Sequence, residues 1–427
     1  MSPEPVPFID LRNDAAGTMI NRTLPLTETV TPADEAAVVE TVREAAAAGT
    51  PVYPIGGAVD LDYGAMPQQP GVGLSLAALD QVIDHAADDM TITVESGITV
   101  RGLAARLDSA GQRLPIDVRA PDRATLGGMV ATNQSGPRRY GCGTLRDYVI
   151  GFRAVDGRGV SFCGGGRVVK NAAGYDLCKL MVGSLGTLGV LTQVTLMVRP
   201  KPETSALVVC EVPNLDTAEQ LLGDLVRSQT RPVAIELLAG PATHTNPSIG
   251  PMLESNVAQL VVGFEGSQAE VDWMVEQLRS EWTEAGIDSP ITVDRRSTDL
   301  LWQWLAGLSA NLQINLLPSA TVGIVAELLD WFPGCSIQSH AGNGVVRVDL
   351  SSFPADRFVE TLRERIRPIV TAAGGHCVVL SPPEGVVCSP DDVWGSSGKG
   401  AAVMRAIKDR FDPNHLLNPG RLAFSDA

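Results

Sequence analysis

The sequence has little positive charge, few aromatic residues and no long apolar run. Its 33 Lys and Arg against 49 Asp and Glu give a net charge of −16 at pH 7, so we exclude nucleic acid as a partner because its phosphates would be repelled. A transmembrane helix needs about 18 or more consecutive apolar residues, which no stretch provides. The opening MSPEPVPFID has no basic residue ahead of an apolar core, which excludes a secretory signal. We therefore expect a cytoplasmic protein.

Several catalytic and metal-binding signatures are also missing. No GxSxG, HExxH or GxxxxGK[ST] run occurs, so α/β-hydrolase, zincin and P-loop functions have no support. No CxxC pair occurs either, which disfavours zinc or iron–sulfur ligation by this chain alone. The scattered cysteines are instead expected to be reduced and buried; they are Cys142, Cys163, Cys178, Cys210, Cys335, Cys377 and Cys388.

Glycine is abundant, and it gathers in three clusters. The first cluster, Gly56–Gly64, follows a predicted strand at Pro51–Ile55, and paired glycines after a strand are typical of a nest of backbone amides around a phosphate. The second cluster, Ala120–Gly143, is built of small residues, as expected where a large flat ligand supplies the missing packing. The alternative for the second cluster is a tight helix contact.

The third glycine cluster lies within Val168–Pro200. Gly183, Gly186 and Gly189 precede a predicted strand at Val190–Val198, a pattern that brings bare backbone close to something bulky. A glycine-rich turn between core elements is the alternative here.

The chain of 427 residues is too long for one ordinary domain. Near 200–205 the pattern changes to a succession of strand, helix, strand, strand and helix, which is typical of a separate α+β module. We predict an α+β protein with four segments: a lead-in at 1–22, a first domain at 23–202, a second domain at 203–404 and a closing segment at 405–427.

Together, the three glycine clusters and the tail FDPNHLLNPGR at 411–421 resemble the FAD-binding flavoproteins of the p-cresol methylhydroxylase, or vanillyl-alcohol oxidase, type. The resemblance covers about 23–200 and 405–421, and four motifs in the expected order make it specific. Within the family, the run RVVKNAAGYD at 167–176 is most similar to the smaller FAD-binding subunit of bacterial glycolate oxidase. The implied fold is a two-part FAD-binding domain, an α+β cap or substrate domain, and a tail that returns to the flavin.

The resemblance also implies where FAD binds. The cofactor should be non-covalent, because Ala58 stands where members that tether FAD have His or Cys. The FAD pyrophosphate is expected on the first cluster, the flavin and its ribityl chain on the second, the adenine half on the third, and Asn418 on the isoalloxazine side. The positions for the first three roles are Pro54, Ile55, Gly56, Gly57, Ala58, Val59 and Asp60; then Pro121, Thr125, Leu126, Gly127, Gly128, Thr132, Ser135, Gly136, Tyr140 and Gly141; and finally Gly186, Gly189 and Val190.

The sequence departs from the family at a metal site. D-2-hydroxyacid dehydrogenases of the family carry a His-x-Gly-Asp-Gly-Asn-x-His motif and a later Gly-Glu-His-Gly. Here the first run reads HAGNGVVR at 340–347, so Arg347 replaces the second histidine, and HCVV follows Gly374-Gly375. Because a divalent ion needs several nitrogen or oxygen ligands, His340 alone holds none tightly, and we predict no metal.

The implied function is an FAD-dependent oxidoreductase, or a subunit of one, that oxidises a short 2-hydroxy acid such as glycolate by hydride transfer to flavin N5. Implied partners are a catalytic flavin paralogue and an iron–sulfur subunit that receives the electrons, through which the chain would lie at the inner membrane. His340 and Tyr175 are candidate bases, with an ordinary loop histidine as the alternative for His340. Arg138 and Arg139 are candidates for holding a carboxylate or the pyrophosphate, with a solvated loop as the alternative.

Two other functions stay open from the sequence. One is an accessory FAD-binding or electron-relay subunit without substrate turnover of its own, which the lost metal ligands favour. The other is a stand-alone, metal-free oxidase of an alcohol or alditol.

Overall fold

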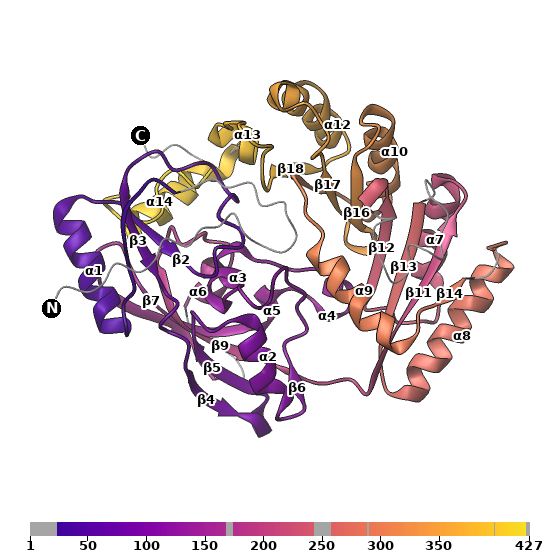
Figure 1. Ribbon diagram of the computed structural model, residues 1–427, viewed down its shortest axis with the longest axis horizontal. Helices are drawn as coiled ribbons and strands as arrows, with labels where there is room; N and C mark the ends of the chain where they lie inside the picture. Colours follow the sequence, from indigo (N-terminus) through magenta and orange to yellow (C-terminus); the bar gives the residue numbers. More distant parts are fainter. Residues whose placement is uncertain (1–23, 168–173, 243–257, 288–289, 397, 424–427) are drawn as a thin grey trace.

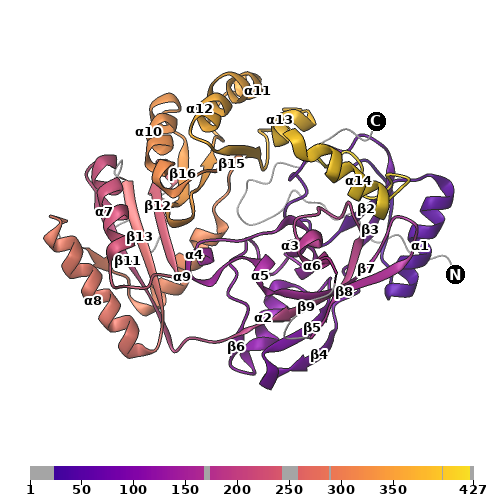
Figure 2. The ribbon, with the colours of Figure 1, turned by 180° about the vertical axis from the view of Figure 1, so that it is seen from behind.

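The computed structural model describes residues 24–167, 174–242, 258–287, 290–396 and 398–423. The predicted lead-in at 1–22 and most of the run at 167–176 lie outside them. Figure 1 shows two halves side by side, with the yellow C-terminal helices returning to the first half. The view from behind shows the same division, with α4 (Arg139–Cys142) and α9 (Arg295–Gly307) near the junction (Figure 2). In the described ranges, no helix is long and apolar enough to cross a membrane.

A small parallel sheet opens the first half. Its strands run in the order β1 (Leu26–Val30), β3 (Gly71–Ser75) and β2 (Val52–Ile55), and α1 (Glu35–Ala48) links β1 to β2. Helix α1 begins where the Asp34 side chain accepts a hydrogen bond from the Ala37 amide at 2.8 Å, and it ends at Gly49 with φ of +64°. Strand β2 leads directly into the first glycine cluster.

A five-stranded antiparallel sheet completes the first half. Its order is β4-β5-β9-β7-β8, and helices cover one face, where the interior is made of aliphatic side chains such as Leu103, Met129 and Val194. On the other face, Val155 and Val190 pack with α1. The strands are β4 (Val82–Ala86), β5 (Thr91–Glu95), β7 (Val149–Val155), β8 (Ser161–Gly165) and β9 (Val190–Met197), and the helices are α2 (Val100–Asp108), α3 (Leu126–Thr132), α5 (Leu145–Tyr148) and α6 (Leu177–Met181).

A short two-stranded sheet marks the passage to the second half. Strand β6 (Gln112–Arg113) pairs with β10 (Arg199–Pro200), and β11 (Thr204–Val212) then opens a new sheet.

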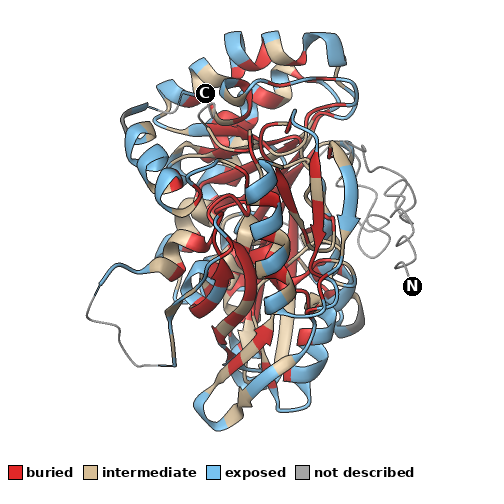
Figure 3. Cartoon of the chain, turned by 90° about the vertical axis from the view of Figure 1, so that its left-hand side faces the viewer, coloured by how far each residue is buried: buried red, intermediate tan, exposed pale blue. Residues whose placement is uncertain are grey.

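The second half is built on an eight-stranded antiparallel sheet in the order β14-β11-β13-β12-β16-β17-β15-β18. Most of its helices pack on the outer face, and α9 packs on the inner face, toward the first half. Figure 3 shows the strands mostly buried and the outer sides of the helices exposed. The remaining bounds are β12 (Ala234–Ala239), β13 (Ala258–Gly266), β14 (Ile291–Thr292), β15 (Leu312–Asn315), β16 (Ser336–His340), β17 (Val345–Asp349), β18 (His376–Val379), α7 (Leu215–Arg227), α8 (Gln268–Glu284) and α10 (Thr321–Trp331).

One outer helix changes its winding along its length. It opens with a 3₁₀ turn, becomes α-helical, passes through a π-helical turn and ends as an α-helix. These parts are Ala355–Arg357, α11 (Phe358–Thr361), Leu362–Ile366 and α12 (Arg367–Ala372).

The tail then crosses back to the first half through α13 (Pro390–Trp394) and α14 (Ala401–Phe411). Lys408 on α14 is 1 % exposed, and its ammonium donates to the Thr187 carbonyl at 2.8 Å, the Leu417 carbonyl at 2.9 Å and the Asp412 carboxylate at 2.6 Å. A buried charge is stable only when it is paired in this way. The Leu416 carbonyl also accepts from the Val52 amide at 2.8 Å, so the tail lies beside β2.

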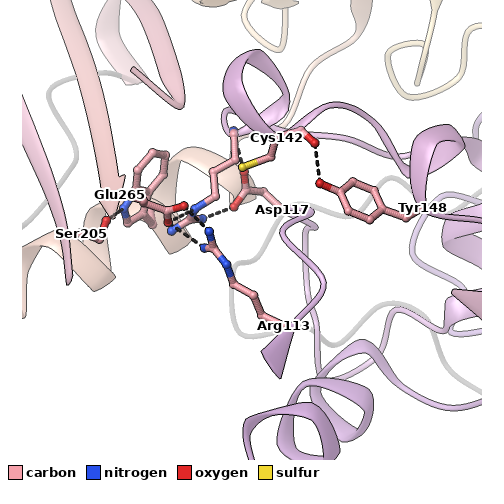
Figure 4. Close-up of polar contacts among 8 residues, drawn as sticks. Arg113, Asp117, Cys142, Tyr148, Ser205 and Glu265 are labelled. Atoms are coloured by element: carbon pink, nitrogen blue, oxygen red, sulfur yellow. Dashed lines mark hydrogen bonds and ion pairs between the residues drawn. The ribbon is translucent and has the colours of Figure 1, made fainter. Parts of the chain in front are cut away.

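A buried ion network joins the two halves (Figure 4). Glu265 on β13 accepts two hydrogen bonds from Arg113, at 2.9 and 2.5 Å, and one from Arg138 at 2.7 Å. Arg138 also pairs with Asp117, and its guanidinium lies 3.8 Å from the ring centroid of Trp302 on α9. Burial works to lower the pKa of Arg138, but the Asp117 and Glu265 carboxylates raise it. This network fixes the first half against the eight-stranded sheet of the second half, which we call the cap sheet.

Candidate functional site

The first half contains a cleft at the place where its glycine clusters and the tail meet. The first cluster forms one wall, the start of α3 forms the next, and the turn at Leu185–Gly186 and the tail residue Asn418 close it. The lining residues are Pro54, Gly56, Gly57, Ala58, Val59, Asp60, Leu61, Tyr63, Leu76, Ala124, Thr125, Gly127, Gly128, Met129, Ala131, Thr132, Gln134, Leu185, Gly186, Asn418 and Arg421.

Glycine is required at the first cluster by contacts within the protein. A Cβ on Gly56 would lie 2.2 Å from the Thr125 hydroxyl, and a Cβ on Gly57 would lie 1.6 Å from the Arg123 carbonyl oxygen. The first two glycine clusters therefore pack directly on each other. This tight contact is the alternative that the sequence left open for the second cluster, and it is compatible with a ligand in the cleft above it.

Two arginines fix the conformation of the first cluster. Arg119 donates to the Val59 carbonyl at 2.6 Å and to the Asp60 carboxylate at 3.1 Å, while Arg123 donates to the Ala58 carbonyl at 3.2 Å. Asp60 also accepts a hydrogen bond from Gln134. The carbonyl groups of the cluster are thus held by guanidinium groups.

The first amides of the same cluster are different from its carbonyl groups. Within the described part of the chain, the backbone N–H groups of Gly56 to Asp60 donate no hydrogen bond. Because free backbone N–H groups seek an acceptor, a row of them in a cleft fits the oxygens of a phosphate or pyrophosphate. Ala58, with φ of +54°, bends the cluster between these amides.

Asn418 presents a further polar atom to the cleft. Its backbone is in the left-handed region at φ of +45°, its amide donates to the Val52 carbonyl at 2.8 Å, and its side-chain NH₂ donates to the Leu185 carbonyl at 2.6 Å. The side-chain oxygen is buried and has no hydrogen-bond partner among the described residues. An unpaired buried acceptor is costly, so a ligand that donates a hydrogen bond there would be stabilised. These features fit FAD, the cofactor that the resemblance implies.

The structure brings together about half of the residues predicted to hold FAD. In the cleft are Pro54, Gly56, Gly57, Ala58, Val59, Asp60, Thr125, Gly127, Gly128, Thr132, Gly186 and Asn418. The described lining does not include Ile55, Pro121, Leu126, Ser135, Gly136, Tyr140, Gly141, Gly189 or Val190. Contact of this second set with the cofactor stays a prediction.

Some residues of the second set contact other parts of the protein. Val190 is fully buried in the core beside α1. A Cβ on Gly189 would lie 3.3 Å from the Phe162 ring, and one on Gly141 would lie 2.7 Å from Val233. Gly141 also donates its amide to the Val233 carbonyl at 3.0 Å, so this glycine joins the two halves.

The candidate base His340 lies at the end of β16, on the inner face of the cap sheet. It is 2 % exposed, and its Nδ1 is 2.7 Å from a carboxylate oxygen of Glu236, which is fully buried on β12. The other Glu236 oxygen accepts from Gln338 at 2.8 Å. Nε2 of His340 is buried, and nothing in the described part of the chain forms a hydrogen bond with it. His340 and Glu236 therefore form a buried, hydrogen-bonded pair.

The other candidate base, Tyr175, is 94 % exposed just before α6, and the cleft lining does not include it. The two candidate arginines have different surroundings: Arg138 is engaged in the network between the halves, whereas Nε of Arg139 is buried without a partner. Among the residues described, no group of three or more His, Cys, Asp or Glu is placed to hold a metal ion.

Several residues of this region were missed in the sequence. Arg119, Arg123 and Gln134 brace the first cluster, and Glu236 partners His340. Glu236 could have been recognised from the sequence, because it is the only charged residue in the apolar strand Ala234–Ala239. The two arginines could not have been recognised, because nothing in their spacing shows that they contact carbonyl groups about 60 positions away in the chain.

Comparison with known families matches both halves of the chain. The family described as "FAD binding domain" matches residues 27–162, and "FAD linked oxidases, C-terminal domain" matches residues 201–327 and 396–422.

Several individual proteins are also similar to this chain. Glycolate oxidase subunit GlcD of Bacillus subtilis is 27% identical over 88% of this chain and 84% of its own length, and D-2-hydroxyglutarate dehydrogenase of Xanthomonas citri is 27% identical over 89% and 86%. Glycolate oxidase subunit GlcE of Escherichia coli is 28% identical over 80% and 84%. The solved structure of an alkyldihydroxyacetonephosphate synthase, 18% identical, has a TM-score of 0.69 over 94% of this chain and 78% of that one, which shows the same fold.

Proposed function

Because the chain belongs to the FAD-linked oxidases of the p-cresol methylhydroxylase type, and is an FAD-dependent oxidoreductase, we propose that it oxidises a short 2-hydroxy acid such as glycolate. The support for this substrate class is that relatives aligned along most of the chain are named for glycolate and D-2-hydroxyglutarate. We also propose the domain division 23–202, 203–404 and 405–427; its first boundary is supported by β11, which opens the new sheet at Thr204, whereas its second falls within α14 (Ala401–Phe411).

The observation that carries the cofactor assignment is the row of free amides at Gly56 to Asp60 facing the same cleft as the unpartnered oxygen of Asn418. The amides would hold the pyrophosphate, and Asn418 would hold the end of the flavin that the tail covers. FAD, when bound, supplies a two-electron acceptor for the hydrogen on the carbinol carbon. The chain's own task is to bind the acid, orient it, exclude water and receive the hydroxyl proton.

We further propose that the chain works beside a second flavin subunit and passes electrons to an iron–sulfur partner. GlcD and GlcE are named as glycolate oxidase subunits, and the chain matches both at similar identity. The seven cysteines, six of them buried, form no disulfide. Burial raises the pKa of Cys210 and of Cys377 to about 12, so the thiolate form that would ligate a cluster is disfavoured at both positions.

A second candidate is an accessory FAD subunit that turns over no substrate. The observation in its favour is Arg347, which takes the place of a metal-binding histidine of the family's dehydrogenases. A stand-alone oxidase of an alcohol or alditol is the third.

The deciding experiment is anaerobic mixing of the purified, FAD-loaded chain with glycolate, D-lactate and a neutral alditol, while the absorption of oxidised flavin is followed. Bleaching by the 2-hydroxy acids alone is the expected result. Bleaching only by the alditol would establish the third candidate. A flavin that stays oxidised until the partner subunits are added would establish the accessory role and overturn turnover by this chain.

A further inference from the structure

Glu236, His340, Arg347 and Arg139 gather where the cap sheet meets the first half. His340 lies opposite Glu236 in the sheet register, and Arg347 lies opposite Gln338, the residue that donates to Glu236. Since directly opposed residues, and those two positions apart, share a face, three of the four side chains lie on the inner face of the sheet. Arg139 comes from α4 of the first half, which packs on β12 and on the turn at Ala341–Asn343.

The two arginines of this cluster carry uncompensated positive charge. Among the residues that the structure describes, Arg347 and Arg139 form no ion pair, and Nε of each is buried without a hydrogen-bond partner. Burial lowers the pKa of both, and the charge of Arg119 lowers that of Arg347 further. Arginine nevertheless stays protonated, because its reference pKa is above about 12. A buried cation without a partner is costly, so an anion at this place would be stabilised.

The charges of the cluster indicate what kind of anion would fit there. Glu236 is the acid whose charge acts on both arginines, and Asp60, which also acts on Arg347, is paired with Arg119 at 3.1 Å. The two guanidinium groups exceed the Glu236 carboxylate by one positive charge. That excess matches a single carboxylate, which a guanidinium binds in a bidentate manner.

The position of the ring hydrogen of His340 follows from its partner. A buried carboxylate can only accept, so Glu236 fixes the hydrogen of His340 on Nδ1, where the two atoms are 2.7 Å apart. Nε2 then carries a lone pair, and it has no partner in the described protein. A hydroxyl group next to the carboxylate of a ligand would donate to this atom.

We propose that Arg347 and Arg139 hold the carboxylate of the substrate and that His340, positioned by Glu236, receives the proton of its 2-hydroxyl group. The O–H bond breaks with its proton going to Nε2 as the C=O bond of a 2-oxo acid forms, and FAD, when bound, would accept the hydrogen of the C–H bond together with its electron pair. Arg347 thereby supplies a fixed positive charge at the position where the family's dehydrogenases have a metal-ligating histidine. This inference rests on the proposed function, because it specifies how the same site binds its acid.

The test uses oxamate, a non-oxidisable monoanion of glycolate size, and its neutral analogue oxamide. Calorimetric titration of the FAD-loaded chain should show binding of oxamate and none of oxamide. Arg347→Met and Arg139→Met should each weaken oxamate binding about 10- to 100-fold, as expected for losing hydrogen bonds between charged groups. Arg227→Met serves as the matched control, because that arginine is 79 % exposed on α7, and its affinity should equal that of the wild type.

The proton acceptor is tested separately from anion binding. His340→Asn should slow flavin reduction by glycolate about 100-fold or more, with oxamate affinity within about twofold of the wild type. Glu236→Gln should also slow reduction, yet it should bind oxamate at least as tightly, since it removes the negative charge that opposes the anion. If Glu236 had only a structural role, Glu236→Gln would slow flavin reduction and also weaken oxamate binding. Retained FAD absorption and circular dichroism check that each variant folds.

The outcomes separate the two proposals. Unchanged oxamate affinity in Arg347→Met, or wild-type reduction rates in His340→Asn, would overturn this inference while glycolate oxidation by the wild type stands. If the wild type binds oxamate through Arg347 but no 2-hydroxy acid reduces its flavin, the proposed function fails and the anion site remains.

Discussion

At the scale of single residues, the first glycine cluster depends on a backbone contact that no other residue allows. Gly57→Ala would place a methyl group 1.6 Å from the Arg123 carbonyl oxygen, so the two clusters must separate. We expect a loss of about 1–3 kcal/mol or more in the free energy of unfolding, together with weaker FAD binding, measured by urea denaturation and flavin fluorescence.

A matched control is available on α10. A Cβ on Gly323 meets nothing within 4 Å, and Gly323→Ala should stabilise the protein by about 0.5–1 kcal/mol through helix propensity. Equal effects of the two substitutions would show that the close contact at Gly57 is unimportant.

The glycine clusters were predictable from the sequence at this scale, but their packing was not. Pairs such as Gly56-Gly57 signal an unusual backbone, and most residues expected at the pyrophosphate do line the cleft. What the sequence could not show is which atoms face each glycine, because Thr125 and Arg123 come from a distant segment. Tyr175 illustrates the converse: it lies in a recognisable motif, yet its side chain is 94 % exposed.

At the scale of elements, α1 is held on the five-stranded sheet by one carboxylate in addition to its apolar packing. Glu35 accepts hydrogen bonds from Arg153 at 2.6 and 3.0 Å and from Thr192 at 2.6 Å. The hydrogen bond from Arg153 lowers the pKa of Glu35 from 4.5 to about 2. Because the pKa is lower in the folded state, this contribution to stability is complete above about pH 4.5 and is lost as the pH falls to about 2.

The variant Glu35→Gln should therefore be less stable than the wild type at pH 7, and the difference should shrink between pH 4.5 and 2. We expect the difference in the free energy of unfolding to be about 1 kcal/mol at most, since the Arg153 side chain is 47 % exposed and solvent screens the pair. Urea denaturation over this pH range measures it. A difference that stays constant down to pH 2 would contradict the role of the carboxylate.

The tail helix α14 depends on Lys408. Lys408→Met would leave the fully buried Asp412 carboxylate without its cation, and removing one member of a buried pair costs about 3–5 kcal/mol. FAD affinity should fall as well, because the same tail positions Asn418. The double variant Lys408→Met with Asp412→Asn should recover part of the stability in calorimetry. No recovery would indicate that Lys408 acts through its carbonyl contacts alone.

At the scale of the whole molecule, Glu265 couples the two halves. Glu265→Gln removes the charge that Arg113 and Arg138 share, and we expect calorimetry to show one thermal transition for the wild type and two for the variant. Lys201→Met is the control, because its ion pair with Asp108 is more than half exposed and should contribute within about 0.5 kcal/mol. A single transition in Glu265→Gln would place the coupling elsewhere.

The broad organisation followed from the sequence, whereas the junction between the halves did not. The change of pattern near 200–205 agrees with the new sheet that begins at Thr204, and the FAD-binding class was recognisable from the glycine clusters and the tail. Arg138 was considered only as an anion-binding residue, and its partner Glu265 was not foreseen. Pairs across a junction depend on how two sheets meet, which local periodicity does not encode.

The position of Asn418 also has a consequence for biosynthesis. A ribosome makes the first glycine cluster early, but the residue that closes the cleft is number 418 of 427. The nascent N-terminal half therefore leaves the exit tunnel with an unfinished cofactor pocket, and it must wait for the entire cap sheet to be translated. We therefore expect the complete cleft to form only after Asn418 has been made, and a translation product that ends before Asn418 would lack this wall of the cleft.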